Sequence, residues 1–86
     1  MAKYMVEAPH TKERCLEALD EVLATGPEFL AEFHWGCPVG VHNGWAIVEG
    51  ESESAVRDML PASQREKWGI TEVTKFTPEQ IEAYHQ

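Results

Sequence analysis

The chain has 86 residues and a formal net charge of −8, from 15 acidic and 7 basic side chains. A chain of this length accommodates one domain, so residues 1–86 are expected to fold as a unit. The few scattered basic residues argue against nucleic acid and anionic membranes as partners. The longest uncharged run, residues 33–48, is broken by Gly, Pro, His and Asn, and the first residues lack an extended apolar segment. We therefore expect a cytoplasmic protein whose two cysteines are thiols or metal ligands rather than a disulfide.

The first half of the chain begins with a predicted strand over residues 3–8, where apolar side chains alternate. An amphipathic helix is predicted over residues 12–24, with Thr11 as its N-cap. Its apolar face carries Cys15, Leu16, Leu19, Val22 and Leu23. Gly26 and Pro27 are typical of a helix end.

A hairpin is predicted next. Residues 29–37 alternate as a second strand and residues 45–49 return as a third. The segment 38–44 between them is expected to turn, and Asn43-Gly44 is its clearest hairpin signal.

The last third predicts a helix, a strand and a short helix. Ser52 or Ser54 caps a helix that runs to about residue 60, and Pro61 interrupts it. Ser63 with Glu66 has the spacing of a capping box that restarts the helix. Residues 70–76 are predicted as the fourth strand, and the residues from Thr77 to Gln80 have the pattern that begins a short terminal helix.

This order predicts an α+β fold, a ferredoxin-like β-α-β-β-α-β two-layer sandwich with a short C-terminal helix. Right-handed crossovers place both main helices on one face of an antiparallel sheet. The other face is left bare and carries Met5 and, depending on register, Trp45 or Val48. We expect a homodimer in which two such faces pack sheet to sheet.

Three segments carry a resemblance to a known superfamily: residues 3–7, 44–49 and 72–76. They resemble small ferredoxin-like proteins of unknown function within the dimeric α+β barrel superfamily. That superfamily includes muconolactone isomerases, small cofactor-free monooxygenases and a nickel-binding group. The resemblance implies the fold and the homodimer. It assigns no catalytic residue, because fold analogy alone does not carry a function.

The topology also predicts a metal site. The turn after the first strand and the turn between strands two and three lie at the same end of the sheet, so four thiol and imidazole side chains gather there. They are His10, Cys15, Cys37 and His42. Such a set suits Zn²⁺ in a tetrahedron, and nickel in another geometry. The sequence has no close Cys-x₂-Cys pair of the kind that marks zinc sites most clearly.

Each of these residues also has an ordinary structural role. A cysteine on an apolar helix face, as Cys15 is, is most often a small core residue. Cys37 alternates in phase with the preceding strand and is compatible with the core. His10 and His42 fit exposed turn positions.

Two other functions use the same region. In the first, His34 or His42 is the candidate general base, oriented by a nearby glutamate. The aromatic residues Phe33, Trp35 and Trp45 line an apolar pocket for a small ligand. That arrangement suits a cofactor-free isomerase or monooxygenase acting on a small apolar or cyclic substrate. In the second, the chain is an interaction subunit without a pocket. We rank a ligand-binding or metal-binding homodimer, with Zn or Ni as the candidate metal, ahead of both.

Overall fold

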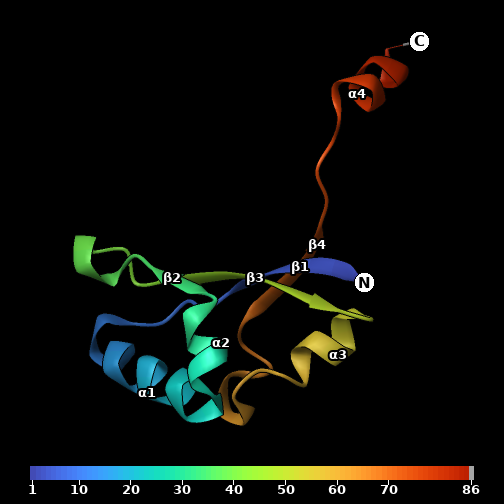
Figure 1. The fold of residues 1–86 in the computed structure, drawn as a ribbon. Helices are drawn as coiled ribbons and strands as arrows, with labels where there is room; N and C mark the ends of the chain where they lie inside the picture. Colours follow the sequence, from blue (N-terminus) through green and yellow to red (C-terminus); the bar gives the residue numbers. More distant parts are fainter. Residues whose placement is uncertain (86) are drawn as a thin grey trace.

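Residues 1–85 are described by a computed structural model, in which four antiparallel strands form one sheet (Figure 1). The strands are β1 (Ala2–Glu7), β2 (Phe33–Trp35), β3 (Gly44–Gly50) and β4 (Gly69–Val73), and they lie in the order β2-β3-β1-β4. β1 is central: it pairs with β3 along its whole length and with β4 from Lys3 to Glu7. The short β2 pairs with the first residues of β3.

Helices cover one face of this sheet. α1 (Cys15–Thr25) follows a single 3₁₀ turn, η1 (Lys12–Arg14), and leads into α2 (Pro27–Ala31); α3 (Glu53–Arg57) follows β3. Two further 3₁₀ turns are η2 (Cys37–Val39) and η3 (Ala62–Gln64). Figure 1 shows α1, α2 and α3 together beneath the sheet, while α4 (Pro78–Tyr84) stands apart at the end of an extended segment on the other side. The prediction of an α+β fold with helices on one face of an antiparallel sheet is confirmed.

The core lies between the sheet and these helices. Alternate residues of the strands point into it, as period-two side chains of a half-covered sheet do. Trp68 is its largest fully buried side chain. The core cluster consists of Tyr4, Val6, Ala8, Val22, Phe33, Ala46, Val48, Val56, Leu60 and Trp68.

The predicted apolar face of α1 is only partly right. Ala18 and Val22, which are four residues apart, are the buried residues of this helix. Leu16 is 69% exposed and Leu23 is 50% exposed. At about 100° per residue, both leucines lie more than about 100° around the helix from the Ala18–Val22 line. The helix therefore meets the sheet through a narrow stripe of small side chains.

The predicted second strand over residues 29–37 is wrong at both ends. Pro27 does not only end α1; it occupies the first turn of α2, a position that proline favours. Phe29 and Phe33 are four residues apart, and their rings meet edge to face at 5.1 Å between centroids. The alternation of apolar residues here fits a helical turn as well as a strand, and only Phe33–Trp35 pairs with β3.

The hairpin turns at a different glycine from the one predicted. Gly40 has φ +89°, the only left-handed residue of this turn within the described chain, so Asn43-Gly44 is not the turn dipeptide. Gly44 instead begins β3, and a Cβ there would lie 2.7 Å from two ring atoms of Trp35. Glycine is thus required because the indole packs directly across the strand.

Capping was predicted with mixed success. The Ser52 hydroxyl accepts a hydrogen bond from the Ala55 amide at 3.1 Å, and Thr77 forms a full capping box with Gln80. The capping box predicted from Ser63 and Glu66 is absent from the described chain: η3 follows Pro61 and has no side-chain cap. The fourth strand ends at Val73 rather than at residue 76, and its last pair with β1 is Val73 with Lys3.

Candidate metal centre

The sheet register brings two of the predicted ligands together. Antiparallel pairing of Glu7 with Trp45 continues one step at a time beyond the strands, to Ala8 with Gly44 and then to His10 with His42. The backbone confirms this continuation, because the Ala8 amide donates to the Gly44 carbonyl at 2.8 Å and the His10 amide donates to the His42 carbonyl at 3.2 Å. Residues paired in this way present their side chains on the same face.

Cys37 reaches the same place from the other side of β3. Trp35 pairs with Gly44, so two further steps align Cys37 with His42. The Gly36 amide donates to the Asn43 carbonyl at 3.0 Å and holds this alignment as the chain leaves β2. A Cβ on Gly36 would lie 2.7 Å from the Val41 carbonyl oxygen, so this close approach requires glycine.

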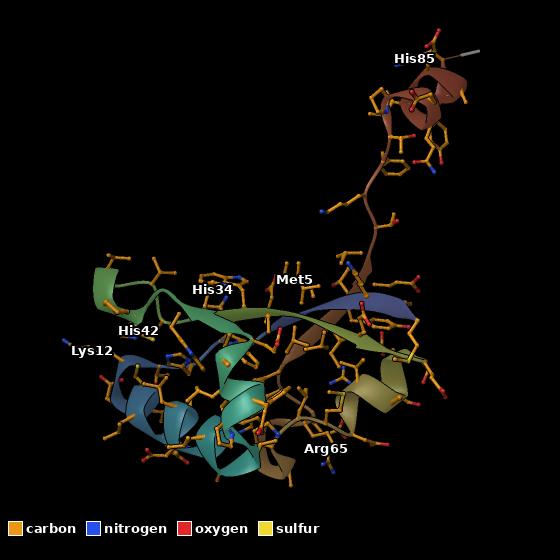
Figure 2. The ribbon with its side chains drawn as sticks, viewed as in Figure 1. Met5, Lys12, His34, His42, Arg65 and His85 are labelled. Carbon is orange, nitrogen blue, oxygen red and sulfur yellow. The ribbon has the colours of Figure 1, made fainter. Side chains whose placement is uncertain are left out.

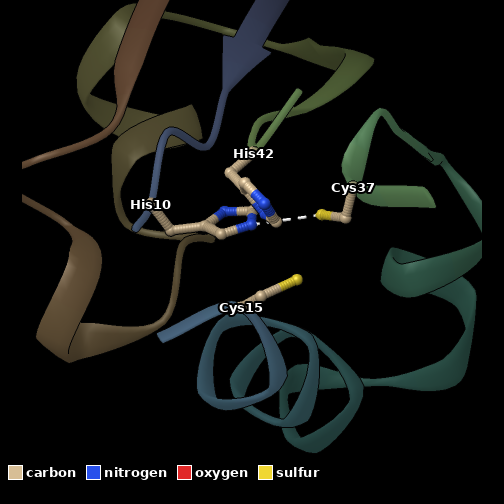
Figure 3. Close-up of side chains that lie close together, drawn as sticks. All are labelled: His10, Cys15, Cys37 and His42. Carbon is tan, nitrogen blue, oxygen red and sulfur yellow. Dashed lines mark hydrogen bonds between the residues drawn. The ribbon is translucent and has the colours of Figure 1, made fainter. Parts of the chain in front are cut away.

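Cys15 comes from the helical layer. Thr11 accepts a hydrogen bond from the Arg14 amide and so closes the 3₁₀ turn η1, which leads directly into α1. Cys15 is the first residue of α1 and lies under the end of the sheet, beside the three ligands from the loops (Figure 3).

The structure therefore brings together all four predicted ligands, with no acidic residue among them. Their donor atoms all lie within 4.8 Å of one another, and each of the four residues is partly buried. The shortest separation recorded is 3.2 Å, between His10 Nε2 and Cys37 Sγ (Figure 3). The two imidazole rings meet at 5.7 Å between centroids, with an interplanar angle of 70°.

The His10 ring is oriented by a carbonyl that the sequence analysis did not single out. His10 Nδ1 lies 2.9 Å from the Ala8 carbonyl oxygen, which can only accept. Nδ1 therefore carries the proton of the neutral ring, and Nε2 offers its lone pair toward the cluster. A histidine that ligates a metal commonly donates its other nitrogen to a backbone carbonyl in this way. Trp35 lies against the same ring, at 6.0 Å between centroids.

The surroundings of Cys37 and His42 disfavour a free thiolate and leave a buried ring nitrogen without a partner among the described residues. Burial raises the pKa of the Cys37 thiol above its ordinary value, and the hydrogen bond and charge of the neighbouring Cys15 sulfur raise this pKa further. His42 Nδ1 is buried and has no hydrogen-bond partner among residues 1–85. Both cysteines are free thiols. A cation would remove each of these penalties, since it binds thiolate sulfur and an imidazole lone pair directly.

The dimensions of the cluster fit a small tetrahedral ion. A tetrahedron's edge is about 1.6 times its centre-to-corner length, so Zn–N and Zn–S bonds of about 2.0–2.3 Å give edges of about 3.3–3.8 Å. The separation of 3.2 Å between His10 and Cys37 is already close to this range. The upper bound of 4.8 Å exceeds it by about 1 Å, so the donor atoms would close by up to about this distance around an ion.

The residues predicted for an enzyme site are divided between the two faces of the sheet, with His34 and Trp45 beside one hollow on the uncovered face. Phe33 and Trp35 stack on the helix-covered face, with ring centroids 5.3 Å apart, while Trp45 pairs with His34 on the opposite face. The three aromatic residues therefore do not line one pocket, because successive residues of a strand point to opposite faces. His34 is exposed, as Figure 2 also shows, and within residues 1–85 no carboxylate lies within hydrogen-bonding distance of its ring.

No family model matches this chain. Neither the curated proteins nor the solved structures contain a match to it. Within residues 1–85, no helix has the length and apolar character needed to cross a bilayer. The chemistry of the four-residue cluster is therefore the main guide to function.

Proposed function

We propose that this protein binds one Zn²⁺ ion through His10, Cys15, Cys37 and His42. The observation that carries the proposal is the convergence of two thiols and two imidazoles to within 4.8 Å. Soft sulfur and borderline nitrogen donors favour zinc over magnesium or calcium, which prefer oxygen. An S₂N₂ tetrahedron is typical of zinc, whereas nickel(II) and copper(II) favour planar or tetragonal sites.

The same geometry favours a structural role for the ion. Catalytic zinc sites keep a coordination position open for water or substrate, while closed sites with four protein ligands stabilise a fold. Here the four donors come from two segments, residues 10–15 and 37–42, which are separated by α1, α2 and β2. The ion would join the start of the helical layer to the turn of the hairpin, at the end of the sheet where the short β2 leaves few ladder bonds.

We further propose that the fold is ferredoxin-like and belongs with the dimeric α+β barrel proteins that the sequence resembles. The support is topological. The connection from β1 to β2 carries α1 and α2 and passes over β3, and the connection from β3 to β4 carries α3 and passes over β1. Two interlocked connections of this kind, each skipping one strand, make up the split β-α-β arrangement.

Metal content and cobalt spectroscopy test the zinc proposal. Protein purified without a metal-affinity tag is expected to contain one zinc ion per chain by elemental analysis. After the zinc is removed, Co²⁺ is expected to bind with the visible absorption of a tetrahedral thiolate complex. Cys37→Ser and His42→Ala are expected to lose this spectrum, and His34→Ala serves as the matched control because His34 lies outside the cluster.

Three results would contradict the proposal. The first is a chain that takes up no Co²⁺ or Zn²⁺ at equimolar concentration. The second is a Co²⁺ spectrum that survives both ligand substitutions. The third is a strong preference for Ni²⁺ with a square-planar spectrum, which would reassign the metal while keeping the ligands.

A further inference from the structure

The two cysteines of the cluster form a pair that folding brings together from different segments. Cys15 is the first residue of α1 and Cys37 is the first residue of η2. Their sulfur atoms lie within 4.8 Å of each other, and Figure 3 shows both pointing into the space between α1 and the loop after β2. The sequence contains two cysteines, so an intramolecular disulfide in this chain has only one possible pairing.

Both cysteines lie outside the core. Each is partly buried, and neither belongs to the core cluster between the sheet and the helices. Leu16, which follows Cys15, is 69% exposed, and residues 38–41, which follow Cys37, are all exposed. The short β2 before Cys37 is held by only three residue pairs with β3. A small solute can therefore reach the sulfur atoms, and the segment that carries Cys37 has room to shift.

A bound zinc ion makes this pair of sulfur atoms reactive toward hydroperoxides, because it holds them as thiolates. In the first step one thiolate attacks a peroxide oxygen: an S–O bond forms, the O–O bond breaks, and the leaving oxygen takes a proton and departs as water or an alcohol. In the second step the other thiolate attacks the sulfenic acid: an S–S bond forms, the S–O bond breaks, and hydroxide takes a proton and departs as water. The two sulfur atoms together lose two electrons, and the peroxide gains them.

The second cysteine determines which product forms. A sulfenic acid that has no thiol beside it is open to further oxidation to sulfinic acid, which thiols do not reduce. In this chain the second sulfur atom already lies within 4.8 Å of the first. The disulfide is therefore expected to form before a second molecule of oxidant arrives.

The disulfide is incompatible with the zinc site. Its sulfur atoms are about 2.0 Å apart, whereas two corners of the zinc tetrahedron are about 3.3–3.8 Å apart. Oxidation also removes the negative charge of both thiolates and leaves the imidazoles of His10 and His42 as the remaining ligands. The bond nevertheless joins the same two segments as the ion, so the start of the helical layer stays attached to the hairpin after the ion has left.

We propose that hydroperoxides oxidise Cys15 and Cys37 to an intramolecular disulfide, and that this bond expels the zinc ion. The site then releases zinc in response to an oxidant and binds it again when a thiol reduces the disulfide. Zinc release rests on the zinc site proposed above, whereas the disulfide itself requires only the two neighbouring sulfur atoms.

Peroxide treatment of the zinc-loaded full chain tests the proposal. Hydrogen peroxide is added in the presence of a colorimetric zinc chelator, and the chelator without peroxide provides the baseline. Each chain is expected to release one zinc ion and to lose the mass of two hydrogen atoms, while it stays monomeric on a non-reducing gel and folded by circular dichroism. Dithiothreitol is expected to restore both the mass and zinc binding. His34→Ala is the control and is expected to behave as the wild type, because His34 lies outside the cluster.

Two variants separate this proposal from the zinc proposal. His42→Ala lacks one zinc ligand but keeps both cysteines, so it is expected to form the disulfide with no zinc to release. Cys15→Ser is expected to gain oxygen atoms at Cys37 instead of losing hydrogen.

Different outcomes contradict the two proposals. A wild-type chain that binds no zinc but still forms the disulfide would refute the zinc site, and zinc release with it, while supporting the cysteine pairing. A chain that binds zinc and keeps it in peroxide would overturn the present proposal and leave the zinc site standing. The same holds if zinc is released with sulfinic acids, with disulfides between chains or with unfolding in place of the intramolecular bond.

Discussion

Zinc binding should raise the stability of this protein by an amount that follows from where the ligands lie. Cys15 and Cys37 are 22 positions apart in the sequence and meet only in the folded chain, so the unfolded chain has no preformed site. Binding energy then becomes folding energy. At a free zinc concentration 1,000 times Kd, the free energy of unfolding rises by about 4.1 kcal/mol. A domain of this size gains about 4–8 °C in Tm per kcal/mol, so Tm is expected to rise by about 16–33 °C.

Removing one ligand reduces this gain in a calculable way. If Cys37→Ser weakens zinc binding about 100-fold, the linkage energy at the same zinc concentration falls by about 2.7 kcal/mol, which leaves about 1.4 kcal/mol. The zinc-induced increase in Tm should then shrink to about 6–11 °C. Thermal unfolding followed by circular dichroism, in zinc and in a chelator, measures both values. His34→Ala is the control and is expected to keep the full increase.

The reasoning would be refuted by a Cys37→Ser variant that gains as much from zinc as the wild type. It would equally be refuted by a wild-type chain whose Tm is the same in zinc and in chelator.

Other predictions concern the pH dependence of the site and the packing around it. Because the pKa of the Cys37 thiol is raised, the thiol is protonated at neutral pH and zinc must displace its proton. The affinity for zinc should therefore fall as the pH is lowered, by up to tenfold per pH unit for each proton displaced. Competition titrations at several pH values measure this dependence, and an affinity that does not change with pH would contradict it. Gly44→Ala should lower the free energy of unfolding by about 1–3 kcal/mol through overlap with Trp35. Gly69→Ala, whose Cβ would meet its nearest neighbour at 3.9 Å, should not, and equal urea midpoints for the two variants would contradict the packing argument. Trp68→Ala should cost about 3–5 kcal/mol in urea denaturation, and a cost below about 1 kcal/mol would show that Trp68 is not a central core residue.

The metal ligands were predictable from the sequence because their meeting depends on topology alone. Any right-handed strand-helix-strand order of this kind puts the loop carrying His10 at the same end of the sheet as the hairpin carrying His42. The exact pairing of His10 and Cys37 with His42 requires the register, which no local pattern reports. The orientation of His10 could not be predicted either, because its hydrogen-bond acceptor is the backbone carbonyl of Ala8, and a backbone carbonyl is present whatever the residue type.

Local chemistry predicted the helix caps better than the extended segments. The hydroxyls of Ser52 and Thr77 each accept a hydrogen bond from the amide three residues further on, so sequence alone suffices. The strand predicted over residues 29–37 is wrong outside Phe33–Trp35, because the aromatic residues there satisfy both a period of two and a spacing of four. Only pairing with β3 decides between the two, and that pairing involves residues that are distant in sequence.

For a related reason, the sequence could not show which face of the sheet each of the three aromatic residues, Phe33, Trp35 and Trp45, occupies. Phe33 and Trp35 share a face by alternation within one strand, but the face of Trp45 depends on how β3 is aligned with β2. A shift of one residue would have placed all three together. The exposure of residues 74–85 was also unpredictable, because a helix pattern specifies a face to be buried without specifying the surface that buries it.

The position of His42 between two register partners sets a rule for insertions and deletions. Adding or deleting one residue between Ala8 and His10, or between Trp35 and Gly44, would send alternate side chains to the far side of the sheet and scatter the donor atoms. Length changes in the segment that joins α3 to β4 leave those alignments untouched. A variant lengthened by one residue between Ala8 and His10, or between Trp35 and Gly44, should therefore fold but fail to hold an ion. A variant lengthened by one residue between α3 and β4 should still hold it.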